Sequence, residues 1–150
     1  MTMKTASLTH EDLLTEWEKD APIDKHHLDT ESVDVPTLHH KYLRIYMDLK
    51  AKKMSYTYKL EDLKKDKELY YSGQATADVY KEKPFDLKLK TKGGVDKHVN
   101  TDPEVVRLAQ RIEYMDILIE GCSHILEQIK WRGNNIKNAI SFIKFQSGEL

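Results

Sequence analysis

Histidine and cysteine are the residue types here that could ligate a metal or act as a nucleophile, and the 150 residues hold seven and one of them. The adjacent pairs His26-His27 and His39-His40 point in different directions on a helix, so neither has metal-ligand spacing. Cys122 and His124 are two positions apart, which does not suit a nucleophile and its base. P-loop, dinucleotide-binding, GxSxG and HExxH motifs are absent from the sequence. These residues predict no enzyme, no metal site and no cofactor.

Lysine and tyrosine form the second group that could do chemistry. Lysine side chains neutralise phosphates and tyrosine rings stack on unpaired bases, which suits single-stranded nucleic acid bound without sequence preference. The candidate DNA-binding residues are Lys50, Lys52, Lys53, Lys59, Lys64, Lys65, Lys67, Tyr70, Tyr71, Lys88, Lys90 and Lys92. A solvated helix face is the alternative interpretation of such a run.

Charge is distributed unevenly along the chain. Residues 1–40 carry three basic and nine acidic side chains, residues 41–97 fifteen and nine, and residues 98–150 six and seven. This asymmetry predicts a helical, basic, single-stranded-DNA-binding region over 1–100 and an oligomerisation helix over 101–150, within one interdependent domain. A single cysteine, no signal sequence and no apolar run long enough to cross a bilayer predict a cytosolic protein.

The elements that position these residues are expected to be mainly α-helical. Thr9 predicts a helix start, with Leu8 packed against Leu13, and Asp20-Ala21-Pro22 predicts its end. The segment 24–34 is weakly helical, and Val35-Pro36 predicts the start of a second long helix that stops at Ser72-Gly73. Alternation of apolar and polar residues predicts a small β-hairpin over about 84–99, with a polar loop as the alternative.

The last third of the chain predicts a third helix, capped by Asp102 and begun by Pro103. Apolar residues recur there in steps of three and four, the pattern of helices that wrap around one another. The predicted oligomer interface is Leu108, Ile112, Met115, Ile119, Cys122, Leu126, Ile129, Ile136, Ile140 and Ile143. Leu118, Ile125 and Ala139 widen this stripe, which favours more than two neighbours per helix. A helix packed only on its own chain is the alternative.

Two blocks of sequence carry a family resemblance. The first is Glu68-Leu69-Tyr70-Tyr71-Ser72-Gly73, after the lysine-rich helix. The second lies in the tail and comprises residues 114–123, Lys130-Trp131-Arg132-Gly133 and Ile136-Lys137. In order and spacing these landmarks resemble the UvsY family of recombination mediators from T-even-like phages, over roughly Leu8 to Gly148.

The resemblance implies a protein that is not an enzyme. It implies a ring of six or seven copies, assembled through the C-terminal helices, that binds single-stranded DNA in the cytoplasm of an infected bacterial host. It also implies contacts with a RecA-like phage recombinase and with the phage single-stranded-DNA-binding protein, which the recombinase replaces on the strand. Basic family positions that contribute to DNA binding correspond to Lys65 and Lys67.

Two other classes of protein stay open from the sequence. One is a structural coiled-coil assembly protein of a phage that does not bind DNA. The other is an enzyme whose site is shared between subunits, although no nucleophile and base pair recommends it. Salt-sensitive binding to an oligonucleotide distinguishes the first of these from a mediator.

Overall fold

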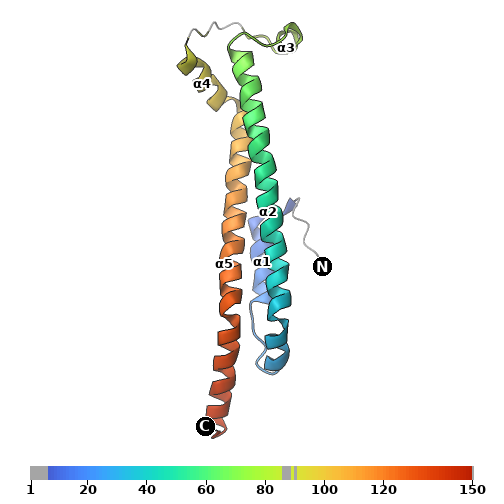
Figure 1. The fold of residues 1–150 in the computed structure, drawn as a ribbon, viewed down its shortest axis with the longest axis vertical. Coiled ribbons are helices and arrows are strands. Elements are labelled where there is room, and N and C mark those ends of the chain that lie inside the picture. Colours follow the sequence, from blue (N-terminus) through green and yellow to red (C-terminus); the bar gives the residue numbers. More distant parts are fainter. Residues whose placement is uncertain (1–6, 86–88, 90, 150) are drawn as a thin grey trace. The chain divides into compact units, whose positions relative to one another are not determined.

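Helices account for all the regular secondary structure in the described part of the chain (Figure 1). The structure is a computed structural model that describes residues 7–85, 89 and 91–149. Its elements are α1 (His10–Asp20), α2 (Leu28–Tyr71), α3 (Ala77–Glu82), α4 (Lys92–Thr101) and α5 (Pro103–Gln146). The predicted mainly α fold is therefore confirmed. The chain divides into two compact units, one of residues 1–51 and 116–150 and one of residues 52–115.

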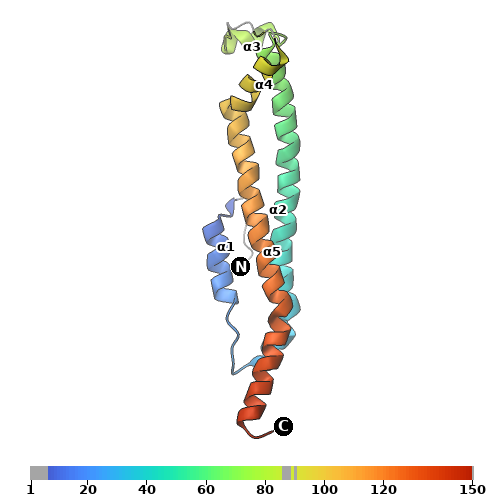
Figure 2. The ribbon, with the colours of Figure 1, turned by 90° about the vertical axis from the view of Figure 1, so that its left-hand side faces the viewer.

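The first unit packs α1 against the first half of α2 and the later part of α5 (Figure 2). Its buried apolar side chains are Leu8, Leu13, Tyr42, Ile45, Leu49, Leu118, Cys122, Ile125, Ile129 and Ile136. Each fully buried aliphatic side chain contributes roughly 1.5–3 kcal/mol. α1 and α5 lie close together at Gly121, where an added Cβ atom would lie 3.2 Å from Leu13 Cδ2. The predicted interface stripe is thus partly covered by its own chain.

Local capping explains the start of α1. The Thr9 hydroxyl accepts a hydrogen bond from the Asp12 backbone N–H at 3.1 Å, and the Asp12 carboxylate accepts one from the Thr9 N–H at 3.2 Å. This reciprocal arrangement is a capping box. Leu8 and Leu13, which flank it, are both buried. The predicted cap at Thr9 is confirmed.

The predicted start of the second helix at Val35-Pro36 is wrong. α2 begins at Leu28 and contains Pro36. Proline is best tolerated in the first turn of a helix, which is why the sequence pattern favoured a start there. The helix passes through the proline because contacts with α5 hold the turns before it. The Glu31 carboxylate, for example, lies 2.7 Å from Arg132 Nη2.

The end of α2 follows the sequence prediction. Gly73 has φ of 79°, a left-handed conformation that glycine adopts without a steric penalty. The Gln74 N–H donates to the Leu69 carbonyl and the Gly73 N–H to the Tyr70 carbonyl, which is a Schellman motif. The motif ends the helix and satisfies carbonyls that the helix leaves without partners.

The predicted β-hairpin over about 84–99 is wrong over its turn and second arm. Residues Lys92–Thr101 form α4 instead, with the Thr91 hydroxyl accepting from the Gly94 N–H at 3.1 Å. Val95 and Val99 are four residues apart, so the helix places them on one face, and Val99 is buried. Most of the predicted first arm (86–88 and 90) lies outside the described residues.

α5 begins as predicted, with Pro103 as its first residue. The Asp102 carboxylate accepts a hydrogen bond from the Glu104 N–H at 2.9 Å. Along the predicted interface stripe, Met115, Cys122, Ile129 and Ile136 are buried, Leu108, Ile112, Ile119 and Leu126 are half-buried, and Ile140 and Ile143 are exposed. The described residues of the chain therefore leave the end of the stripe exposed.

Candidate nucleic-acid interface

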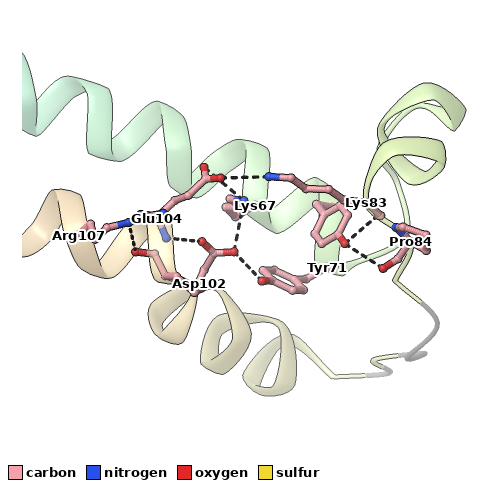
Figure 3. Close-up of polar contacts among 9 residues, drawn as sticks. Lys67, Tyr71, Lys83, Pro84, Asp102, Glu104 and Arg107 are labelled. Atoms are coloured by element: carbon pink, nitrogen blue, oxygen red, sulfur yellow. Dashed lines mark hydrogen bonds and ion pairs between the residues drawn. The ribbon is translucent and has the colours of Figure 1, made fainter.

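The second unit contains a polar cluster centred on Asp102 (Figure 3). The Tyr71 hydroxyl donates to Asp102 Oδ2 at 2.6 Å, and Lys67 Nζ lies 3.3 Å from the same oxygen. Lys67 Nζ is also 3.5 Å from Glu104 Oε2, and Glu104 pairs with Lys83 at 3.2 Å. The cluster connects the end of α2 to the start of α5 within this unit.

Burial and hydrogen bonding act in opposite directions on Asp102. Burial disfavours its charged form, but the Tyr71 hydroxyl, the Glu104 N–H and Lys67 outweigh that effect and hold the pKa of Asp102 below its ordinary value. Burial and the hydrogen bond to Asp102 raise the pKa of the Tyr71 hydroxyl. Lys67 is only 14% exposed and faces two carboxylates. Lys67 and Tyr71 therefore have protein partners that bound DNA would have to displace.

Tyr70 and Tyr71 belong to an aromatic cluster. The Tyr70 ring stacks on Tyr80 at a centroid distance of 5.4 Å, and the Tyr71 ring contacts Phe85 edge-on at 5.0 Å. The Tyr70 hydroxyl donates to the Lys83 carbonyl at 2.9 Å. Aromatic contacts and these hydrogen bonds hold both rings against the rest of this unit, where they are half-buried.

Lys65 and Lys92, which the sequence predicted separately, line one pocket. The pocket has a volume of about 610 Å³ and lies between the end of α2 and α4. Both lysines are exposed. Its remaining lining residues are Glu68, Leu69, Ser72, Gln74, Leu89, Thr91, Val95 and Asp96. The two lysines are cations that can bind the phosphates of a nucleic-acid backbone.

Tyr56 organises a second group of cations in the same unit. Its ring centroid lies 5.9 Å from Lys52 Nζ, 5.4 Å from Lys59 Nζ and 5.0 Å from Arg111 Cζ. Arg111 comes from α5, and sequence reasoning missed it because a single arginine in an apolar stripe carries no local signal. Only the packing of α5 on α2 brings it to the lysines.

The other predicted basic residues are more dispersed. Lys50 is exposed in the first unit, with its Nζ 5.1 Å from the Tyr46 ring centroid. Lys53 and Lys64 are half-buried on α2. Lys88 and Lys90 lie outside the described residues. The structure thus brings together two separate sets, Lys65 with Lys92 and Lys52 with Lys59.

Arg132 is a residue whose role the sequence did not reveal. It is 6% exposed in the first unit. Its Nη1 donates to the Ala21 carbonyl at 2.8 Å, and its Nη2 donates to the Pro22 carbonyl at 3.0 Å and to Glu31 at 2.7 Å. The guanidinium therefore fixes the connection between α1 and α2 against α5. Its position in one of the family landmarks was the available signal.

Metal and thiol chemistry receive no support from the described residues. No three of their histidine, cysteine or carboxylate side chains gather to hold a metal ion. Burial raises the pKa of the Cys122 thiol to about 11, so thiolate, the nucleophilic form, is scarce at neutral pH. Within the same residues, no helix is both long and apolar enough to cross a bilayer.

Fold and site together define a class of protein: a helical protein with exposed cations beside aromatic rings, as in proteins that bind nucleic-acid backbones. Residues 16–149 match the family model described as recombination, repair and ssDNA binding protein UvsY. The chain belongs to the UvsY family.

Individual relatives agree with this assignment. The recombination protein UvsY of Enterobacteria phage T4 is 27% identical over 139 residues, which cover 93% of this chain and 98% of the relative. A crystal structure of the bacteriophage T4 recombination mediator protein UvsY superposes with a TM-score of 0.80 at 26% identity, covering 93% of this chain and 98% of that one. A second crystal form gives a TM-score of 0.79 at 26% identity, with 95% and 99% covered.

Proposed function

We propose that this protein is a recombination mediator that binds single-stranded DNA and promotes loading of a RecA-like phage recombinase in place of the single-stranded-DNA-binding protein. The observation that carries the DNA-binding part is the pocket shared by Lys65 and Lys92. Two exposed lysines, one on α2 and one on α4, line this pocket, and each can neutralise a phosphate and release a counterion. The protein acts by binding rather than by catalysis, in the cytoplasm of the infected host.

Assembly into a ring of six or seven copies is the second part of the proposal. The exposed apolar residues at the end of α5 support it: Ile140 is 37% exposed, Phe142 61%, Ile143 46% and Phe145 70%. Exposed apolar patches of this kind mark interaction sites. In functional terms, residues 101–150 supply assembly and residues 1–100 supply most of the DNA contacts.

Assembly compensates for weak individual sites. Each lysine pocket also contains Glu68 and Asp96, whose charges reduce its attraction for phosphate. In a ring, one strand reaches several pockets, so later contacts are intramolecular and benefit from a high local concentration. A strand bound along several subunits is held away from the single-stranded-DNA-binding protein, which allows a recombinase filament to start on it.

The test measures binding of poly-thymidine strands of increasing length by fluorescence anisotropy over a range of salt concentrations. Wild-type affinity should rise with strand length until the strand reaches several subunits. Lys65→Ala with Lys92→Ala should bind more weakly, and the log–log salt slope should fall by about 0.7 for each lost contact. The matched control is Lys25→Ala with Lys81→Ala, which removes the same charge from two exposed positions outside both basic sets.

Two results would overturn the proposal. If the wild type shows no salt-sensitive binding, the protein is a structural assembly component and not a mediator. If it binds DNA but the pocket variant and the control behave alike, the pocket is not the binding site.

A further inference from the structure

Three cations surround one aromatic ring in the second unit. Lys52 and Lys59 lie four residues before and three residues after Tyr56, so α2 places all three side chains on one face. Arg111 reaches the same ring from α5, with its Cζ 5.0 Å from the centroid. Attraction between the cations and the electron-rich ring face holds the charged groups near one another despite their mutual repulsion.

Two of these three cations form no ion pair within the described residues, although Glu61 and Asp62 follow Lys59 closely in the sequence. Among the described residues, neither Lys59 nor Arg111 forms an ion pair, and both are exposed. Lys67, in contrast, lies within 3.5 Å of two carboxylates. Exposed like charges without counter-charges are stabilised by an anion from outside the chain.

We propose that Lys59 and Arg111, held in place by the Tyr56 ring, form a phosphate-binding subsite for the backbone of single-stranded DNA, separate from the pocket at Lys65 and Lys92. The inference rests on the proposed DNA-binding function. A guanidinium binds phosphate through two parallel hydrogen bonds, whereas an ammonium acts as a point charge. Arg111 supplies the directed contact and Lys59 the second charge.

The decisive variant is Lys59→Ala with Arg111→Ala. It removes two phosphate contacts, so the log–log salt slope for a poly-thymidine strand should fall by about 1.4 for each subunit that the strand contacts. At 0.1 M salt, this corresponds to roughly 25-fold weaker binding per contacted subunit. Lys25→Ala with Lys81→Ala again serves as the charge-matched control, and thermal unfolding confirms that each variant is folded.

Tyr56 is a positioning residue, and its variants separate this role from simple charge. Tyr56→Phe keeps the ring and should bind as the wild type does. Tyr56→Leu keeps an apolar side chain but removes the ring, so binding should weaken even though the net charge is unchanged. In the background of Lys59→Ala with Arg111→Ala, Tyr56→Leu should have no further effect on binding.

The outcomes distinguish this subsite from the function itself. If the wild type fails to bind the strand, the proposed function fails. If the wild type binds and Lys59→Ala with Arg111→Ala keeps the salt slope of the control, the subsite is refuted while the function stands. If Tyr56→Phe weakens binding as strongly as Tyr56→Leu, the hydroxyl rather than the ring positions the cations, and that part of the proposal is wrong.

Discussion

Arg132→Ala should destabilise the first unit more than any surface substitution on α5. The substitution removes three hydrogen bonds and leaves the carbonyls of Ala21 and Pro22 and the Glu31 carboxylate without their shared donor. Breaking a buried charge pair by removing one partner costs about 3–5 kcal/mol. The Glu31 side chain is 25% exposed, so water can reach it and the lower end applies, about 3 kcal/mol.

This cost can be measured as a change in the free energy of unfolding. For a chain of this size, 1 kcal/mol shifts Tm by roughly 2–4 °C, so the expected decrease is about 6–12 °C. Circular dichroism should follow unfolding at one fixed protomer concentration, because assembly would make Tm concentration-dependent. Arg132→Lys keeps the charge but loses the planar fork, and an intermediate decrease is expected.

Lys130, an exposed residue two positions before Arg132, provides the control. Lys130→Ala removes one positive charge from the same helix and should change stability by no more than about 0.5 kcal/mol. Glu31→Gln keeps the shape of the side chain but removes its charge, so a double-mutant cycle with Arg132→Ala isolates the pair. If Arg132→Ala is as stable as Lys130→Ala, water replaces the guanidinium at no cost and the reasoning from burial is refuted.

Two further predictions concern pH and assembly. Because the pKa of Asp102 is held below its ordinary value, its contribution to stability is present above pH ~3.9 and is lost as pH falls through the lower folded-state value. Asp102→Asn should therefore unfold more easily than the wild type near neutral pH, and the difference in urea midpoint should shrink below pH ~4; a constant difference would contradict the assignment. Ile140→Asp with Ile143→Asp should fold, since both positions are exposed in the single chain, but should give a lower molar mass by light scattering. An unchanged molar mass would exclude the end of α5 from the interface.

The helix ends that the sequence predicted are those set by local chemistry. Thr9, Gly73 and Asp102 each form capping hydrogen bonds within a few residues of their own position, so the local sequence is enough to predict these helix ends. The start of α2 and the helical state of α4 depend on packing. Gly93 and Gly94 are poor helix formers, yet burial of Val99 favours a helix there.

In the candidate site, the sequence likewise predicts the residue types but not the partners that each side chain contacts. Sequence identified the lysines, but it could not separate Lys65, which is exposed, from Lys67, which faces Asp102 and Glu104 across the fold. Two positions apart on one helix, they differ because they point in different directions. Arg111 could not be predicted as a site residue from the sequence, because only the packing of α5 on α2 brings it to Tyr56.

Pro36 has a consequence for the order in which the structure opens. It cannot donate a hydrogen bond to the Ser32 carbonyl, so the backbone ladder of α2 is interrupted eight residues after the helix begins. The turns from Leu28 to Val35 are then joined to the rest of α2 by fewer bonds, and we expect amide hydrogen exchange there at a lower opening free energy than in the segment around Tyr42. Residues 28–35 would thus form a small cooperative unit that unfolds before the remainder of α2 does.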